Sequence, residues 1–435
     1  MSSKTSSKTL LIIGYVWPEP NSSAAGTHMM QLIHFFLKQG WSITFASPCN
    51  LGEHKADLLS LGINEQLIEL NNESFDLFIQ QLQPGLVIFD RFMMEEQFGW
   101  RIEKQAPHAV RILNTEDLHS LRAVRQQLIK DYLNTQPDIT DLQKVPLHDA
   151  QRLFEKMATS DLTKREIAAI FRCDLTLMIS EFEMDLLQQQ FQVPIRQLIY
   201  LPFQYEKLPT SALKAFEMRQ HFIAIGNFRH EPNWDAVLWL KQEIWPLIRQ
   251  QLPRAELHIY GAYPSKKATQ LHNPKQGFHV MGWAENAFDV LSQARVCLAP
   301  LRFGAGIKGK LAEAMLCGTP NVTTSIGCES MQIINSEAWG GAIANQPHEF
   351  AEQAVRLYQD AAVWQKAQKQ GYKIVTDRYL QTPTRSQLLL DKINELMTDI
   401  TTHRTANFIG AMLNHHHHKS TQYMSQWIEV KNRLE

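Results

Sequence analysis

The stretch VCLAPLRFGAGIKGKLAEAMLCGTPNVTTSIGCESM, residues 296–331, decides the fold. It predicts a buried strand over residues 296–301, a glycine-rich turn, a helix over about residues 310–317 and a second strand after Gly-Thr-Pro. Glycine lets a ligand approach the backbone, and the free N–H groups at the start of a helix attract anions. Lys308 and Lys310 add positive charge at that point. The stretch therefore predicts an anion site, and a diphosphate site above all.

A P-loop is the first alternative for this turn. The run GAGIKGK at residues 304–310 fits the pattern G-x-x-x-x-G-K between a strand and a helix. The next residue is Leu311, however, where a P-loop needs a Ser or Thr hydroxyl to hold magnesium. The nearest aspartate-bearing strand of the required kind, residues 86–90, lies far upstream. A dinucleotide-binding fingerprint is weaker still, because no G-x-G-x-x-G follows the first strand.

Strand and helix patterns alternate on both sides of the opening stretch. An apolar run over residues 9–17, a helix that closes at Gly40 and a strand over residues 42–47 form the repeating unit of parallel α/β folds. Similar units continue to residue 203, and the alternation restarts at residue 221. The expected units are a first domain of residues 1–203, a linker of residues 204–220, a second domain of residues 221–380, and a C-terminal helix and tail of residues 381–435.

Long helices are also expected from the spacing of apolar residues. The periodicity predicts continuous helices over residues 148–171, 233–251 and 348–379. A further helix is expected near residues 383–398.

Composition limits the class of protein. The chain has 435 residues, of which 44% are hydrophobic and 20% charged, as in a globular protein with a full core. Its formal net charge of -1 gives no electrostatic case for a nucleic-acid partner. The Cys residues are widely spaced without a CxxC pair, which argues against a disulfide framework or a zinc site. No signal peptide or membrane span is predicted, so we expect a cytoplasmic protein, with peripheral contact to the inner face of a membrane left open.

A set of motifs in the second half resembles a known family. Pro300, the glycines of the turn, Lys308, Lys310, Glu313 and the Gly-Thr-Pro of residues 318–320 resemble the donor-binding signature of GT-B-fold glycosyltransferases. The closest resemblance is to the retaining family 4, the glycosyl transferases group 1. It implies an α/β protein of the GT-B fold, in which two Rossmann-like domains face a cleft and a C-terminal helix crosses back to the first domain.

Other segments extend the resemblance over most of the chain. Residues 18–26 resemble the family's N-terminal Pro…Gly-Gly loop, with Ala25 in place of the first glycine. Residues 225–229 resemble the loop that bears a basic residue for the donor phosphates, and residues 280–283 resemble the strand end that meets the nucleobase. By this resemblance the donor-binding residues are Gly26, Arg229, Gly282, Gly306, Lys308, Lys310 and Glu313.

The role of Glu313 also has a physical reason. It lies three residues after Lys310, on the same face of the helix. A carboxylate in the first turn beneath a phosphate site is well placed to accept hydrogen bonds from a ribose diol, as the matching Glu of the family does. The alternative is a Glu that merely favours the helix dipole.

The first domain offers candidates for catalysis and for acceptor binding. Asp117 and His119 lie where a strand ends and a helix begins, and Asp117 is a candidate N-cap. The family often places a His-Asp or similar pair in this region, so the catalytic candidates are Asp117, His119 and Lys308. Asp90 and Arg91 follow a strand at the sheet edge where α/β proteins bind ligands, which makes them candidates for acceptor contacts.

One position departs from the family pattern. The family has an acid-x7-acid pair, and the residue eight positions before Glu313 is Ala305. Because the first acid lies close to the transferred sugar, either the sugar is held differently here or the chain has lost activity. Lys308 is a candidate for the vacated space, as in relatives with Gly-x-Lys-x-Lys before the Glu.

The resemblance implies a glycosyltransferase of polysaccharide biosynthesis. It would move a sugar from a nucleotide diphosphate sugar to a glycan, a lipid-linked molecule or another acceptor, with retention. Lysines, Arg229 and helix N–H groups would stabilise the leaving diphosphate, so neither a metal nor another cofactor is expected. The alternatives are a non-catalytic GT-B assembly partner, suggested by Ala305, and a GT-B sugar-nucleotide epimerase.

Overall fold

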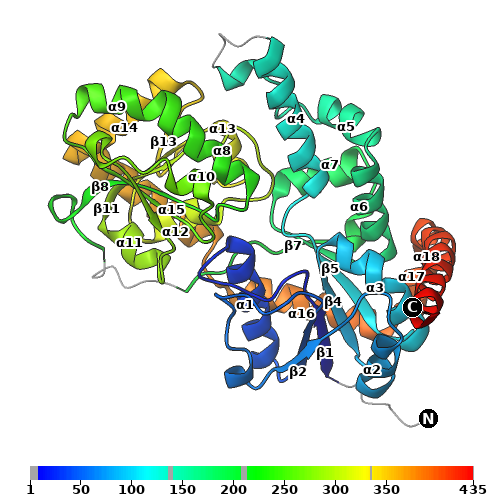
Figure 1. Cartoon of the computed structure of the whole chain (residues 1–435). Coiled ribbons are helices and arrows are strands. Elements are labelled where there is room, and N and C mark those ends of the chain that lie inside the picture. Colours follow the sequence, from blue (N-terminus) through cyan, green and yellow to red (C-terminus); the bar gives the residue numbers. More distant parts are fainter. Residues whose placement is uncertain (1–7, 136–140, 207–212, 334–335, 435) are drawn as a thin grey trace.

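The computed structural model describes residues 8–135, 141–206, 213–333 and 336–434. Within these residues the chain forms two parallel β-sheets, each with helices on its faces (Figure 1). The α/β architecture predicted from the alternation of strands and helices is therefore confirmed.

The first sheet has the strand order β3-β2-β1-β4-β5-β6-β7, with all neighbours parallel. Its central strands are buried along almost their whole length, because helices cover both faces. The strands are β1 (Thr9–Ile13), β2 (Ser42–Ser47), β3 (Asn64–Leu67), β4 (Leu86–Asp90), β5 (Val110–Asn114), β6 (Leu175–Met178) and β7 (Leu198–Tyr200). The helices are α1 (Ala24–Lys38), α2 (Ser74–Leu82), α3 (Phe92–Gln105), α4 (His119–Thr135), α5 (Ala150–Ala158), α6 (Asp161–Arg172) and α7 (Glu181–Gln189).

The second sheet has the order β10-β9-β8-β11-β12-β13, again parallel. The strands are β8 (Gln220–Ile225), β9 (Leu257–Tyr260), β10 (Phe278–Gly282), β11 (Ala294–Ala299), β12 (Asn321–Thr323) and β13 (Gly341–Ile343). The helices are α8 (Glu231–Trp239), α9 (Trp245–Gln251), α10 (Lys266–Thr269), α11 (Ala287–Gln293), α12 (Gly309–Leu316), α13 (Ser325–Cys328), α14 (Pro347–Gln359) and α15 (Ala361–Arg378).

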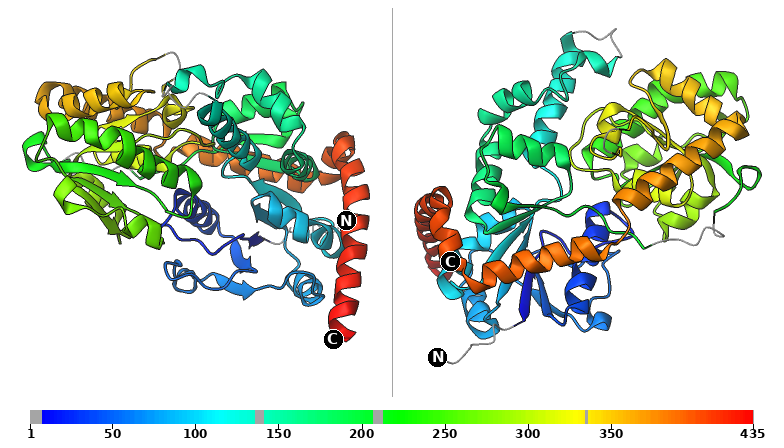
Figure 2. Two further views of the ribbon diagram at one scale, coloured as in Figure 1. Left: turned by 45° about the horizontal axis from the view of Figure 1, so that its top comes forward. Right: turned by 180° about the vertical axis from the view of Figure 1, so that it is seen from behind.

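The C-terminal helices return to the first sheet, as predicted. Helix α16 (Pro383–Thr398) runs from the second domain across the back of the first (Figure 2, right). Its buried side chains Leu389, Ile393 and Leu396 join the same apolar core as Leu10 and Ile12 of β1. Helices α17 (Ile400–Ala406) and α18 (Phe408–Leu434) follow, and α18 packs against α3 and α6. None of the described helices is long and apolar enough to cross a membrane.

The chain passes between the domains at two places that lie side by side. Tyr205 N–H donates to Tyr379 O at 2.7 Å, and Gln381 N–H donates to Tyr205 O at 3.0 Å. These bonds join the two crossings in a short parallel bridge. Residues 207–212 of the expected linker lie outside the described residues.

Two of the long helices predicted from periodicity are interrupted, so those two predictions were wrong in detail, whereas the helix over residues 233–251 is confirmed as a continuous one. Residues 148–171 form α5 and α6, with a break at Ser160, and residues 348–379 form α14 and α15. At the second break the Asp360 carboxylate accepts from the N–H groups of Ala362 and Val363, which starts a new helix. Residues 233–251 contain a π-helical turn, Leu240–Ile244, just before Pro246, which has no N–H to donate.

Candidate functional site

The glycine turn after β11 brings the two domains together. Helix α12 begins directly after the turn, with Lys308 as its N-cap residue. A Cβ at Gly309 would lie 2.7 Å from the Cβ of Ala24, so the starts of α1 and α12 meet. Gly306 has φ 63°, and a Cβ there would lie 3.0 Å from the Cβ of Asp117. The turn therefore needs glycine both for its backbone and for close contact with the first domain.

The two lysines of the turn have different surroundings. Lys308 is buried, and its Nζ donates to the carbonyls of Ala305, at 3.1 Å, and of Gly306. Burial lowers the pKa of Lys308, although Glu329 opposes this. The ammonium group thus lies beside Ala305, on the inner side of the turn.

Lys310 lies in the second domain against the loop that follows β8. Its Nζ donates to Asn233 Oδ1 at 2.6 Å, and a Cβ at Gly226 would lie 2.6 Å from that nitrogen. Burial lowers the pKa of Lys310 to about 8. Of the two predicted lysines, Lys310 is therefore the one that lies at the ends of β8 and β11.

Glu313 lies one helical turn below Lys310 on α12. Its Oε1 accepts a hydrogen bond from the Tyr205 hydroxyl at 3.4 Å, and burial raises its pKa to about 7. Tyr205 belongs to the first crossing between the domains. The structure thus brings together Lys310, Glu313 and the β8 loop, and it connects this group to the crossing.

The rim of the site carries Arg229 and Gly282. Arg229 is exposed, and its guanidinium lies 3.7 Å from the centre of the Tyr263 ring. The Tyr263 hydroxyl donates to Glu19 Oε1 of the first domain at 2.7 Å. Gly282, at the end of β10, has φ 83° and no atom within 4 Å of the position of a Cβ. The loop that contains Glu19 therefore lies beside the end of β9.

Position 26 requires a glycine for a steric reason. It is in the first turn of α1, and a Cβ there would lie 2.3 Å from the carbonyl oxygen of Glu19. Its N–H donates to Ser23 Oγ at 3.0 Å, which caps the helix. Gly26 therefore allows the loop that contains Glu19 to fold back onto α1.

Asp117 lies where the first domain meets the turn. Its carboxylate pairs with Arg122 and lies 3.5 Å from His119 Nε2. Burial alone would raise the pKa of Asp117, but Arg122 and His119 hold it well below its usual range. Burial lowers the pKa of His119 to about 4.

The prediction that Asp117 caps α4 was wrong. The first N–H groups of that helix, on His119 and Ser120, donate to the carboxylate of Glu166 at 2.8 and 2.9 Å. Glu166 comes from α6 and is buried, and a distant carboxylate of this kind leaves no local pattern in the sequence. Asp117 is thereby left to pair with Arg122.

Asp90 ends β4 and Arg91 follows it, next to a polar group that the sequence did not indicate. Burial raises the pKa of Asp90 to about 6, and Arg91 opposes this. His28 Nδ1 lies 3.0 Å from Glu116 Oε1, and Asn114 Nδ2 donates to the same oxygen at 2.7 Å. Burial alone would lower the pKa of His28, but Glu116 raises it. His28 comes from α1, so only the fold brings it to the end of β5.

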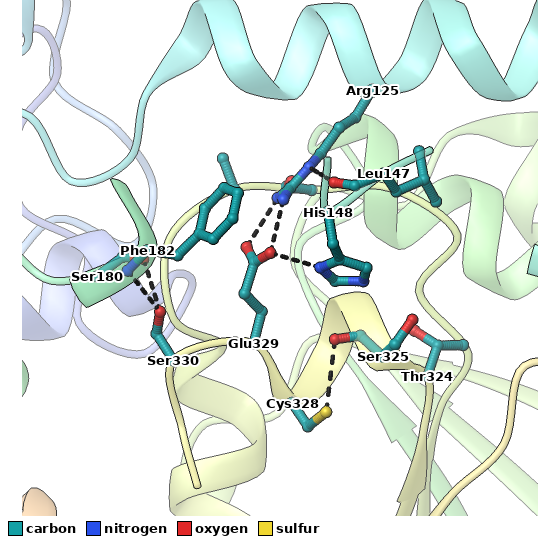
Figure 3. A network of polar contacts seen from close by, with 12 residues as sticks. Arg125, Leu147, His148, Ser180, Phe182, Thr324, Ser325, Cys328, Glu329 and Ser330 are labelled. Atoms are coloured by element: carbon teal, nitrogen blue, oxygen red, sulfur yellow. Dashed lines mark hydrogen bonds and ion pairs between the residues drawn. The ribbon is translucent and has the colours of Figure 1, made fainter. Parts of the chain in front are cut away.

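A buried ion pair joins the domains beside the glycine turn (Figure 3). The guanidinium of Arg125, on α4, donates to both carboxylate oxygens of Glu329 at 2.6 and 2.8 Å. It also donates to the carbonyls of Gly304 and Leu147, each at 2.9 Å. His148 Nδ1 lies 2.9 Å from Glu329 Oε1. Burial would raise the pKa of Glu329, but Arg125 and His148 lower it to about 2, so the pair is ionised at neutral pH.

Among the described residues, one group has ligand atoms close enough to hold a metal ion. Glu256, His258 and His279 have ligand atoms within 4.8 Å of one another. They lie at the beginnings of β9 and β10, at the opposite end of the sheet from the glycine turn. This group therefore does not belong to the site at the turn.

Comparisons with known proteins agree with this arrangement. Residues 219–360 match the family described as glycosyl transferases group 1, and no curated protein matches the chain by sequence. A sucrose-phosphate synthase from Thermosynechococcus elongatus is similar in structure, with a TM-score of 0.63 at 15% identity, over 90% of this chain and 99% of that one. HepE of Anabaena in complex with UDP-glucose has a TM-score of 0.62 at 11% identity, over 89% of this chain and 100% of HepE. A glycosyltransferase from Rickettsia africae has a TM-score of 0.59 at 10% identity, over 90% and 99% of the two chains.

The predicted GT-B fold is confirmed by these structures, which are similar over most of both chains. The group 1 match covers the domain that contains the glycine turn, Lys310 and Glu313. Residues 219–360 therefore match the glycosyl transferases group 1, and the chain as a whole has the GT-B fold.

Proposed function

We propose that the protein transfers a sugar from a nucleotide diphosphate sugar, held by the second domain, to an acceptor held by the first. The observation that carries this proposal is the group formed by Lys310, Glu313 and the start of α12 at the ends of β8 and β11. A partly buried cation and free helix N–H groups suit a diphosphate, and a carboxylate one helical turn away suits a ribose diol. HepE, which shares the fold, binds UDP-glucose.

Five of the seven predicted donor residues have a direct role in this proposal. Lys310 and the N–H groups of α12 would hold the diphosphate, and exposed Arg229 would approach it from the rim. Glu313 would accept hydrogen bonds from the ribose, and the open space at Gly282 would admit the base. Lys308 would fix the carbonyls of Ala305 and Gly306 and so hold the turn in place beside the phosphates.

The chemistry follows from charge. As the bond to the sugar breaks, negative charge develops on the diphosphate, and fixed positive groups in a closed site lower the energy of that state. Lys310 and the helix start would provide this stabilisation without a metal ion. The reaction would retain configuration, with a phosphate oxygen of the leaving group taking the proton of the acceptor.

The acceptor would lie against the first domain. Asp117 and His119 adjoin the turn, and Asp90 and Arg91 lie at the end of the neighbouring strand β4. His119 would be neutral at pH 7, so it could accept a hydrogen bond from a hydroxyl group of the sugar acceptor or donate one to it. We propose a glycan or a lipid-linked acceptor in the cytoplasm, reached at the inner face of a membrane in the second case.

A calorimetric titration tests the function directly. The protein is titrated with UDP, GDP and their hexose conjugates, and products are then analysed with and without glycan and lipid-linked acceptors. We expect micromolar binding of one nucleotide diphosphate and transfer only when acceptor is present. If no nucleotide diphosphate binds, the proposal fails. If the donor alone is converted into an isomer, the protein is an epimerase instead.

Donor binding should depend on pH with a maximum between about 7 and 8. Glu313, with a pKa of about 7, must lose its proton to accept from the ribose, and Lys310, with a pKa of about 8, must keep its proton to bind phosphate. Affinity for a UDP-hexose should therefore fall below pH 7, and above pH 8 it should fall by up to about tenfold per pH unit. Two other titratable groups, Lys308 and Cys297, act on Lys310, and Tyr205 acts on Glu313. Tyr205 does not titrate between pH 6 and 9.5, because burial keeps its pKa well above that range.

Calorimetry between pH 6 and 9.5 measures this profile. The control is Lys310→Arg, because arginine keeps its charge throughout and should remove the alkaline fall while leaving the acid side unchanged. An alkaline fall that persists in this variant would show that Lys310 does not bind the phosphates.

A further inference from the structure

The sequence lacks a carboxylate at Ala305, where the family places the acid closest to the transferred sugar, but the fold brings one there from the other domain. Glu183, in the first turn of α7, accepts a hydrogen bond from the Gly306 N–H at 2.6 Å through Oε1. Gly306 is the residue next to Ala305. The carboxyl group therefore lies against the same turn, although Glu183 is 123 residues away in the sequence.

One oxygen of Glu183 is left for another partner. The side chain is fully buried, and Oε2 has no hydrogen-bond partner among the described residues. A buried polar oxygen without a partner costs free energy, so such an atom in a folded protein commonly marks a place for a ligand or a water molecule. The charges of Asp117 and Lys308 both act on Glu183, and both residues belong to the candidate site.

The position of Glu183 is fixed from both domains. Ser180 caps α7 and accepts from the Glu183 N–H at 3.4 Å. Ser330 of the second domain accepts from the Phe182 N–H at 2.9 Å and lies 3.1 Å from the Ser180 hydroxyl (Figure 3). The start of α7 is thus attached to the second domain, and Glu183 reaches the turn only while the domains are in contact.

The raised pKa of Glu183 suits a contact with hydroxyl groups. Burial and the nearby Asp117 raise its pKa, and the Gly306 N–H and Lys308 oppose this. A protonated carboxyl can both donate and accept, so it can bind a sugar hydroxyl without placing a second negative charge beside the diphosphate.

We propose that Glu183 contacts the donor sugar from the first domain and so replaces the acid missing at position 305. This inference rests on the proposed function. It also means that the nucleotide would be recognised by the second domain alone, whereas the sugar would be recognised only when the domains are closed. Selectivity for the sugar would then depend on closure.

The test compares Glu183→Ala and Glu183→Gln with Asp185→Asn, an exposed acid on the same helix. Affinity for UDP and for the UDP-hexose is measured by calorimetry, and kcat/KM by transfer. For Glu183→Ala we expect UDP affinity within about twofold of the unmodified protein, and a loss of about a hundredfold in kcat/KM. Glu183→Gln should retain more activity, because its amide can still donate and accept, and Asp185→Asn should match the unmodified protein.

A role limited to holding the domains together predicts a different result. In that case the affinities for UDP and for the UDP-hexose would fall by the same factor, and X-ray scattering would show separated domains, which would overturn the inference. Donors that lack single hydroxyl groups give a second measurement. The donor that lacks the hydroxyl group bound by Glu183 should lose no further activity when Glu183→Ala is introduced. If every deoxy donor loses further activity by the same factor, the inference is also overturned. If the unmodified protein binds no UDP or UDP-hexose, the proposed function itself fails, and this is visible before any variant is made.

Discussion

Replacing Arg125 by Met is expected to separate the two domains and to reduce transfer by about a hundredfold or more. The guanidinium is fully buried and donates to Glu329, Gly304 and Leu147. Without it, the ionised carboxylate of Glu329 keeps His148 as its one hydrogen-bonding partner among the residues that the structure describes. Breaking a buried ion pair on one side costs about 3–5 kcal/mol. When the domains separate, Glu329 becomes hydrated again. The free-energy cost of the lost ion pair therefore destabilises the closed arrangement of the domains.

X-ray scattering with and without UDP measures the opening, and kcat/KM measures its effect. The matched control is Arg165→Met, because the Arg165–Glu96 pair is partly exposed and lies within the first domain. Pairs of that kind contribute about 1 kcal/mol or less, so this variant should remain closed and active. The double variant Arg125→Met with Glu329→Leu should recover much of the closure, because two apolar groups leave no buried charge. A compact and active Arg125→Met protein would contradict the expectation.

Replacing Lys310 by Met is expected to weaken UDP binding by about tenfold to a hundredfold. The methionine keeps most of the apolar stem but removes a charged donor, and hydrogen bonds to charged groups contribute about 1.5–3 kcal/mol. Asn233 Oδ1 would also lose its partner at 2.6 Å. The effect should be smaller for UMP, which lacks the second phosphate.

Calorimetry with UDP and UMP separates these contributions. Lys266→Met is the control, because Lys266 is an exposed lysine of the same domain on α10. Its UDP affinity should not change. If Lys310→Met binds UDP as tightly as Lys266→Met does, the diphosphate lies elsewhere.

Local sequence patterns were enough for the architecture and for one side of the site. The glycine turn, Lys310 and Glu313 lie within one strand–turn–helix segment, so their spacing alone predicts that they meet. The helix boundaries were harder, because a cap such as Asp360 outweighs an apolar period that continues through it. Strand β3 was not predicted, since its sequence Asn-Glu-Gln-Leu is polar and it lies at the edge of the sheet.

The contacts between the domains could not be read from the sequence. Arg125 and Glu329 are 204 residues apart, and Glu183 and Gly306 are 123 residues apart. Neither pair belongs to a recurring motif, and a buried Arg or Glu has the same letter as an exposed one. His28 and Glu166 were missed for the same reason. Such residues become visible only when the fold shows which carboxyl ends of the two sheets face one another.

The return of α16 to the first sheet has a consequence for synthesis of the protein. Leu389, Ile393 and Leu396 complete the core beneath β1, yet they leave the ribosome long after the strands they cover. At roughly 5–20 residues per second, residues 204–396 take about 10–40 s to make. During that time one apolar face of the first sheet lacks its cover, so the nascent chain has to be protected from aggregation. The first domain is therefore finished last, and an isolated fragment of residues 1–203 would expose part of its own core.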